Sequence, residues 1–159
     1  MRKLETMFLK NLFDIQDRKK SARFALVKED GMRFLLFDRA YAFRIFGAWF
    51  FNEDEVLEVL GQSGPYTKML NILDDYDGQE IINDGTKIFA GHEVAHFRTI
   101  GDSAKGCVMN LEAWKLLQDY NSTFPFDGSL TYDFKKKIFR YEFGGETFAV
   151  ILGIGGYQE

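Results

Sequence analysis

The chain has 159 residues, of which 46% are hydrophobic and 28% are charged, and its formal net charge is −4 at pH 7. These values are typical of one soluble globular domain, so we expect a single domain over residues 1–159. No apolar run approaches the ~18 residues that a membrane-spanning helix needs, and charged residues interrupt the N-terminal stretch where a signal peptide would be apolar. The single cysteine, Cys107, cannot form an internal disulfide, which favours a reducing, cytoplasmic setting.

The first fifty residues predict a helix followed by three strands. Apolar residues recur at helical spacing over residues 4–16, which indicates a helix with one apolar face. Asp30-Gly31 is a hairpin signal between two apolar-rich runs. The aromatic run AYAFRIFGAWFF could stack nucleic-acid bases, but a core strand with Trp49 at a sheet edge accounts for it better.

An acidic stretch over residues 51–80 is predicted to be a short helical insertion. Asn52 before EDEVLEVLG is typical of a helix N-cap followed by acids in the first turn, and Gly61 ends this helix. A further helical turn is expected within GPYTKMLNILDD. DDYD (74–77) lacks the spaced ligands of an EF-hand loop, so it predicts a solvated turn rather than a cation site.

The second half of the chain predicts strands around one more helix. NDGT (83–86) is a turn signal, and KIFAG then begins an extended run. Residues 110–120 have the apolar spacing of a helix. Polar and apolar residues alternate over 130–135, and Gly144-Gly145 is a turn signal before the last strand, TFAVILGIG. GGETFAVILGIGG is not followed by a helix, so we interpret it as a strand and tail rather than a phosphate loop.

The two ends of the chain share an order of elements. LETMFLKNLFD precedes ARFALVKEDGMRFLLFDRAYAFRIFG, and LEAWKLLQDY precedes GSLTYDFKKKIFRYEFGGETFAVILG. We therefore expect an α+β fold with antiparallel sheets, in which residues 4–50 and residues 85–156 form two similar helix-then-three-strand units.

The second unit resembles one domain of a sliding DNA clamp, through INDGTKIFAGHEVAHFRTIG, GCVMNLEAWKLLQDY and SLTYDFKKKIFRYEFGGETFAVILG in that order. The resemblance covers residues 85–156, with 4–50 as the weaker first copy. It implies that helices line a DNA-facing surface and that sheets form the outer face. A clamp chain carries two or three such domains, whereas this chain has room for one, and residues 51–80 have no counterpart in the family.

Positive charge is concentrated near the N-terminus. Residues 1–23 carry seven Lys or Arg residues against three acids, whereas the remainder carries 13 basic and 21 acidic residues. Lys10 and the cluster of Arg18, Lys19 and Lys20 are candidate nucleic-acid-binding residues, because such charges neutralise phosphates without selecting a sequence. The cluster is also compatible with a solvated loop after a helix.

These features favour a non-enzymatic binding module. The clamp resemblance points to DNA metabolism, and the small size and lack of enzyme motifs suggest an accessory protein of a phage or mobile element. The alternative is a protein inhibitor that binds a basic partner through Glu53, Glu55 and Glu58. The expected partners are thus a protein, the DNA backbone or both, without a membrane, and a homo-oligomer is possible under either hypothesis.

HEVAH matches the H-E-x-x-H pattern of zinc peptidases and contains both histidines of the chain. On a helix, His92 and His96 could bind zinc together with Glu112, and Glu93 would act as general base. Strand-forming residues between two turn signals favour a strand over residues 88–98 instead, which would hold the histidines about 13 Å apart. A zinc metallopeptidase is therefore the enzymatic alternative, and the preferred hypothesis has no catalytic residue, metal or cofactor.

Overall fold

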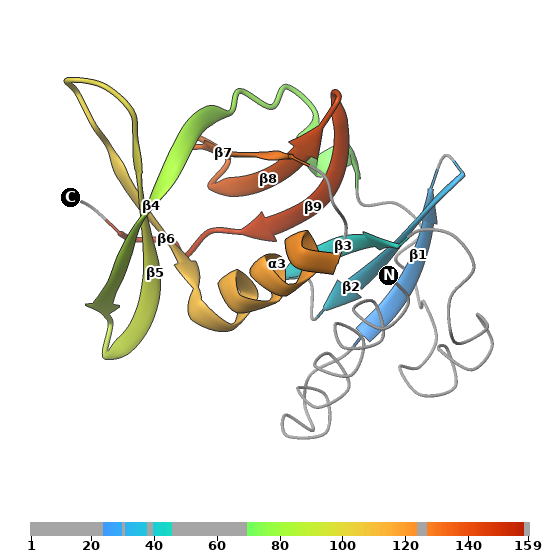
Figure 1. Cartoon of the computed structure of the whole chain (residues 1–159), viewed down its shortest axis with the longest axis horizontal. Coiled ribbons are helices and arrows are strands. Elements are labelled where there is room, and N and C mark those ends of the chain that lie inside the picture. The colour runs from blue at the N-terminus through green and yellow to red at the C-terminus, as the bar shows by residue number, and fades with distance from the viewer. Residues whose placement is uncertain (1–23, 30, 38–39, 46–69, 124–126, 158–159) are drawn as a thin grey trace.

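The computed structural model describes residues 24–29, 31–37, 40–45, 70–123 and 127–157 (Figure 1). The strands are β1 (Phe24–Glu29), β2 (Met32–Phe37), β3 (Tyr41–Ile45), β4 (Gln79–Phe89), β5 (His92–Thr99), β6 (Gly106–Asn110), β7 (Ser129–Asp133), β8 (Ile138–Phe143) and β9 (Glu146–Leu152). The helices are the 3-10 turn η1 (Leu70–Leu73) and α3 (Leu111–Thr123). All nine strands belong to one antiparallel sheet in the order β1-β2-β3-β9-β8-β7-β4-β5-β6.

The prediction of an α+β fold with two similar helix-then-three-strand units is wrong. In the described residues, one large antiparallel sheet carries a single α-helix, so the fold is closer to all-β. The third strands of the two predicted units, β3 and β9, pair with each other, with Ala42 opposite Val150, so the strands merge into one sheet. Consecutive residues are buried in both strands, as expected for strands covered on both faces. The single merged sheet also contradicts the arrangement of a sliding-clamp domain, which the resemblance had implied.

Parts of the predicted units lie outside the described residues, namely the helix over 4–16 and the first part of the insertion over 51–80. The described end of the insertion holds η1 and the start of β4. Two predicted turns are confirmed. Gly31 takes a φ of 76° between β1 and β2, and Gly144 and Gly145 take φ values of 59° and 81° between β8 and β9, a region that glycine enters without strain.

The predicted turn at NDGT is wrong, because this stretch forms a bulge inside β4. Between Asn83 and Thr86, two residues of β4 stand opposite one residue of β5. Gly85 in the bulge takes a φ of 82°, which explains why the sequence signal resembles that of a turn. The chain reverses later, at Ala90 and Gly91, where φ is 51° and 81°.

β4 divides the sheet into two halves. It pairs with β7 only through Gln79 and Glu80, and its later residues pair with β5 alone. The strands β4–β6 therefore diverge from the rest of the sheet after Glu80, as Figure 1 shows. The C-terminal segment returns to this half, since the Ile154 N–H donates to the Val108 carbonyl at 3.3 Å.

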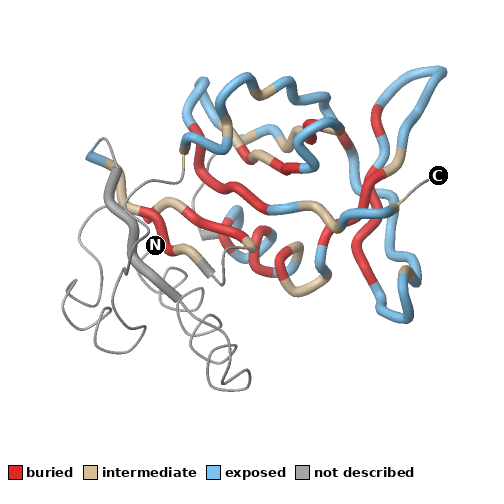
Figure 2. The backbone as a smooth tube through the Cα atoms, turned by 180° about the vertical axis from the view of Figure 1, so that it is seen from behind, coloured by how far each residue is buried: buried red, intermediate tan, exposed pale blue. Residues whose placement is uncertain are grey.

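The larger of the two hydrophobic cores formed by the described residues lies where α3 packs against the sheet (Figure 2). α3 begins after Asn110, whose side-chain oxygen accepts a hydrogen bond from the Ala113 N–H at 3.2 Å. Its buried face supplies Ala113, Leu116, Leu117 and Tyr120. The fully buried Phe97 ring lies 5.0 Å from the Trp114 ring and 5.3 Å from the Phe139 ring, in geometries that favour aromatic pairs.

A second, smaller core lies apart from the first and covers part of the sheet near η1. Its buried members are Phe34, Ala42, Ile138 and Val150, and Leu70, Leu73 and Tyr76 pack against them. This contact fixes the segment that leads from η1 into β4. Within the described residues, no helix has the length and apolar character needed to cross a membrane.

Candidate functional site

His92 and His96 lie on β5, so the helix required by a zinc-peptidase site is not formed at HEVAH. Four residues of a strand span about 13 Å, and two imidazoles at that separation cannot share one ion. His92, Glu93 and Glu112 line a hollow of about 310 Å³ beside the start of α3, but His96 does not line it. In the part of the chain that the structure describes, no group of three or more His, Cys, Asp or Glu side chains could hold a metal ion.

His96 makes the contacts of a structural residue. Its side chain is 2% exposed, and its Nδ1 lies 3.6 Å from the Asp84 carboxylate, which also lies 3.7 Å from Nε of Arg98. The Asn83 side-chain amide donates to the His96 carbonyl at 2.9 Å. The ring of Tyr157 lies 5.9 Å from the imidazole ring. These contacts hold the β4 bulge and the C-terminal segment against β5.

The other predicted site residues lie outside the described residues. They are the candidate nucleic-acid-binding residues Lys10, Arg18, Lys19 and Lys20 and the candidate partner-binding residues Glu53, Glu55 and Glu58. The aromatic run is described as far as Ile45, and its described residues Tyr41, Phe43 and Ile45 are buried, as expected of a core strand.

A groove of about 480 Å³ lies between the segment entering β4 and the turn that joins β7 to β8. It is lined by Asp75, Asp77, Gln79, Asp133, Phe134, Lys135 and Lys136. The segment before β4 contributes the exposed carboxylates of Asp75 and Asp77, and the turn contributes the exposed ammonium groups of Lys135 and Lys136. The groove therefore has one acidic side and one basic side.

Asp133 holds the two sides of the groove together. Although it is only 3% exposed, its carboxylate accepts backbone N–H groups from Asp77, Lys135 and Lys136, each at 2.9 Å. Burial by itself raises the pKa of this carboxyl, but the three hydrogen bonds and the nearby Lys136 charge outweigh burial and hold the pKa below its usual range. Asp133 is thus ionised at neutral pH and fixes the backbone of both sides.

A second contact fixes the acidic side. The hydroxyl groups of Tyr76 and Thr131 share a hydrogen bond of 2.8 Å between the segment before β4 and strand β7. Burial raises the pKa of the Tyr76 phenol to about 12, so it stays protonated at neutral pH. An added Cβ at Gly78 would lie 2.4 Å from the Tyr76 ring and 2.6 Å from Oγ1 of Thr131, so only glycine fits there.

The basic side belongs to a run of three successive exposed lysines, Lys135–Lys137, which we name the lysine turn. Lys135 and Lys136 line the groove. Lys137 takes a φ of 59°, and its N–H donates to the Asp133 carbonyl at 2.7 Å. The Gly153 N–H donates to the Lys137 carbonyl at 2.8 Å, which joins the turn to the segment after β9. No carboxylate among the described residues forms an ion pair with these three ammonium groups.

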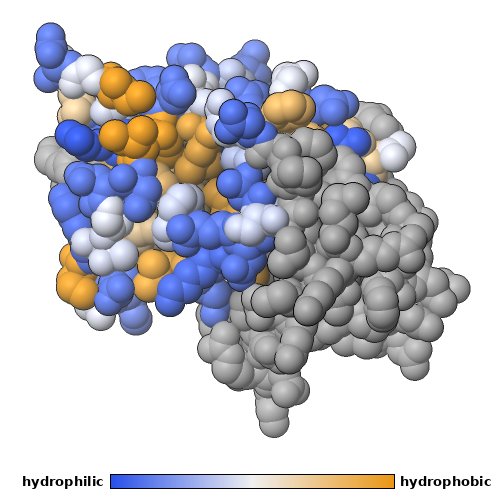
Figure 3. Space-filling view, in the orientation of Figure 1, coloured by the Kyte–Doolittle hydropathy of each residue, from blue (hydrophilic) through white to orange (hydrophobic). Residues whose placement is uncertain are grey.

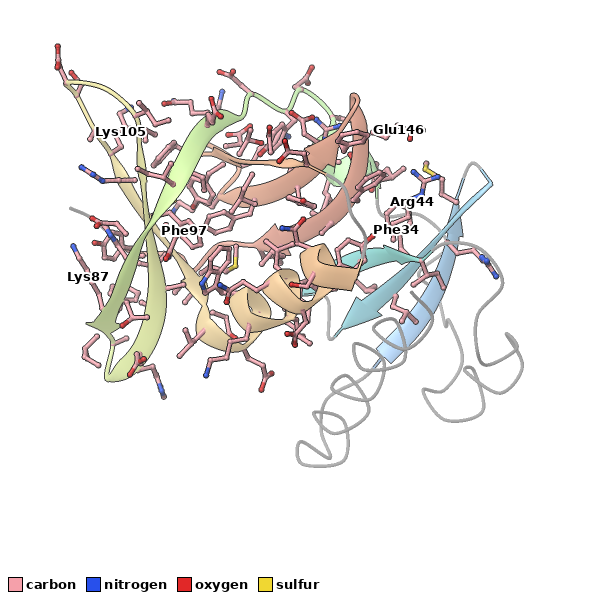
Figure 4. The ribbon with its side chains drawn as sticks, viewed as in Figure 1. Phe34, Arg44, Lys87, Phe97, Lys105 and Glu146 are labelled. Atoms are coloured by element: carbon pink, nitrogen blue, oxygen red, sulfur yellow. The ribbon has the colours of Figure 1, made fainter. Side chains whose placement is uncertain are left out.

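Phe134 lies between the lysine turn and the core. Its ring is partly exposed, packs against the larger core and lies 4.8 Å from the Tyr132 ring at 87°. The Lys105 ammonium lies over the same ring, 5.6 Å from its centroid. Figure 4 shows Lys105 at the end of the β4–β6 half opposite to Lys87. In Figure 3, hydrophobic residues appear among hydrophilic ones at the upper left, on the side of the molecule where Figure 1 places β4–β6.

Sequence analysis did not identify this groove, although two signals were available. DFKKKIF joins two strand patterns through three lysines, which is the pattern of a charged turn. DDYD was predicted to be a solvated turn, and Asp74, Asp75 and Asp77 are indeed exposed. The two segments are more than fifty residues apart in the chain, so only the β4–β7 pairing reveals that they face each other.

Comparisons of the chain with models of protein families, with curated proteins and with solved structures find no match. Function must therefore be inferred from the residues of the chain itself. The groove combines fixed backbone, exposed charge and an accessible aromatic ring, which makes it the best-defined candidate site in the described residues.

Proposed function

We propose that the chain is a non-enzymatic, cytoplasmic binding protein that contacts the phosphate backbone of nucleic acid through the lysine turn, as an accessory protein of DNA metabolism or of a phage or mobile element. The observation that carries the proposal is a run of three exposed lysines, Lys135–Lys137, on backbone fixed by Asp133. Lysine ammonium groups bind phosphates as point charges and release condensed counterions. Lys105 adds a fourth positive charge beside Phe134.

The net charge of −4 belongs to the whole chain, and salt screens charges that lie more than about 8 Å from a bound phosphate. The carboxylates that share the groove with Lys135 and Lys136 are those of Asp75, Asp77 and Asp133. The N-terminal cluster of Arg18, Lys19 and Lys20 lies outside the described residues, and its members stay candidate phosphate contacts. A cytoplasmic setting is supported by Cys107, which is a buried free thiol.

The test is fluorescence anisotropy with a labelled 20-nucleotide DNA over a series of salt concentrations. Three or four phosphate contacts predict that log affinity falls with log salt at a slope of about −2 to −3. Lys135→Gln/Lys136→Gln should weaken binding about tenfold and reduce the magnitude of the slope by about 1.5. Lys115→Glu on α3 is the matched control, since it changes net charge by the same amount and should leave the slope unchanged.

Absence of salt-sensitive binding would refute the proposal, as would an equal loss in the Lys115→Glu control. Lys19→Glu/Lys20→Glu is a separate variant that measures the contribution of the N-terminal cluster. Loss in this variant alone, with normal binding by Lys135→Gln/Lys136→Gln, would move the contact away from the lysine turn.

A protein inhibitor of a basic partner is the second candidate, and one observation favours it. Five exposed acids without an intervening base follow η1: Asp74, Asp75, Asp77, Glu80 and Asp84. Asp74→Asn/Asp75→Asn should weaken capture of such a partner, as should substitution of Glu53, Glu55 and Glu58, whereas Lys135→Gln/Lys136→Gln should not. The measurement is a titration by fluorescence anisotropy with a labelled basic protein, such as a histone, as the probe. Weaker binding by Lys135→Gln/Lys136→Gln, with unchanged binding by the variants of the acidic residues, would reject this candidate.

A further inference from the structure

The groove beside the lysine turn has the composition of a site for one unpaired nucleotide. Its volume, about 480 Å³, falls within the range of small-ligand sites. Lys135 and Lys136 supply positive charge, Phe134 supplies an aromatic face, and Asp77 and Gln79 supply hydrogen-bonding groups opposite the lysines. Phosphate, base face and base edge thus each have a partner of the appropriate chemistry.

Phe134 lines the groove together with Lys135 and Lys136. A base on its ring and a phosphate on the lysines would therefore lie in the same groove. The core and Tyr132 support the ring, which limits the entropy lost when a base binds. The Lys105 ammonium now lies over the ring at 5.6 Å and is carried by an exposed, flexible side chain. A base that stacks on the same face of the ring must displace this ammonium group.

The groove contacts would favour single strands over duplexes. In a duplex both faces of each base are covered by neighbouring base pairs and its edge is paired, so neither is free to meet Phe134 or Asp77. A single strand brings one phosphate chain, and its exposed base edges can donate N–H groups to Asp77, since carboxylates accept from base amino groups.

From these contacts we propose that the groove binds one unpaired nucleotide of a single-stranded nucleic acid, with the base on Phe134 and its phosphate on Lys135 and Lys136. This inference rests on the proposed function, because it names the class of nucleic acid that the lysine turn contacts. It adds a requirement that backbone contact alone does not have, namely an unstacked base.

The experiment compares three labelled probes of equal length with the full chain at one salt concentration. They are a mixed-sequence single strand, the same sequence as a blunt duplex, and a strand of abasic nucleotides. The proposal predicts that the single strand binds about tenfold more tightly than either of the others, since stacking one base accounts for a difference of that order. The abasic probe removes the base and keeps the phosphates, so it tests stacking without altering the protein.

Phe134→Leu is the matching variant, because leucine can keep the apolar contact with the core but offers no ring. It should bind all three probes with the affinity that the native chain has for the abasic strand, at an unchanged salt slope. Phe143→Leu is the control, since Phe143 is 42% exposed at the end of β8 and lies outside the groove. It should behave as the native chain.

Equal affinity for single strand, duplex and abasic strand, with a normal salt slope, would overturn the stacking site and leave the backbone contact standing. Normal single-strand preference in a folded Phe134→Leu protein would also overturn it. Absence of salt-sensitive binding to every probe would overturn the proposed function itself, so the two failures are distinguishable.

Discussion

Asp133 offers the sharpest test of the groove, because one buried carboxylate holds three backbone N–H groups. In Asp133→Asn, Oδ1 can still accept from Lys135 and Lys136, but an NH2 group replaces the oxygen that faces the Asp77 N–H. The lost charged hydrogen bond costs about 2 kcal/mol, and the two weakened ones cost about 0.5 kcal/mol each. We therefore expect the free energy of unfolding to fall by about 3 kcal/mol.

Urea denaturation followed by far-UV circular dichroism measures this loss directly. In a chain of this size the same change lowers the melting temperature by roughly 6–12 °C. Asp102→Asn is the matched control, since Asp102 is exposed in the β5–β6 loop, and it should change stability by less than about 0.5 kcal/mol. A loss in Asp133→Asn no larger than in this control would refute the role assigned to Asp133.

The same carboxylate predicts a pH dependence. Its pKa is lowered in the folded chain relative to 3.8, so the unfolded chain binds more protons in the interval between the two values. The Asp133 carboxylate therefore stabilises the fold fully when the pH is above its pKa in the unfolded chain. This stabilisation is lost as the pH falls through the lower pKa that the carboxyl has in the folded chain. The difference in unfolding free energy between native protein and Asp133→Asn should shrink over that interval, and a constant difference would contradict this.

Two further predictions concern the groove wall and HEVAH. Gly78→Ala should destabilise the fold by about 2 kcal/mol in urea denaturation, because its Cβ would meet the Tyr76 ring at 2.4 Å. Gly155→Ala, where the space is open, is the control and should change little; similar effects would contradict the close approach. Purified protein should contain no stoichiometric zinc by plasma mass spectrometry, because β5 is extended. One zinc per chain that is lost on His96→Ala would contradict this.

Local signals in the sequence predicted several elements correctly. The single strand predicted over residues 88–98 is interrupted by the reversal at Ala90 and Gly91, but the part that contains HEVAH is extended, as predicted from its β-branched and aromatic neighbours, and lies in β5 (His92–Thr99). The helix over 110–120 was predicted from apolar spacing and is observed as α3. The hairpin signals at Gly31 and Gly144-Gly145 depend on positive φ, which few residues other than glycine adopt readily.

Which strands pair in the sheet could not be predicted from the sequence, for physical reasons. A repeated order of helix and strands does not state which strands pair, so the contact of β3 with β9 could not be read from the chain. Gly85 gives the same signal in a bulge as in a turn, because both need a positive φ. Asp133 alternates with apolar neighbours as a surface residue would, yet it is buried, because its hydrogen bonds replace solvent.

The most direct test of nucleic-acid contact through the lysine turn is photo-cross-linking. A single strand containing 5-bromouracil would be irradiated with the full chain, and the cross-linked peptides would be mapped by mass spectrometry. We predict cross-links within residues 134–137, with Phe134 as the main site, and their loss in Lys135→Gln/Lys136→Gln. Cross-links confined to other parts of the chain, and unchanged in that variant, would contradict the account.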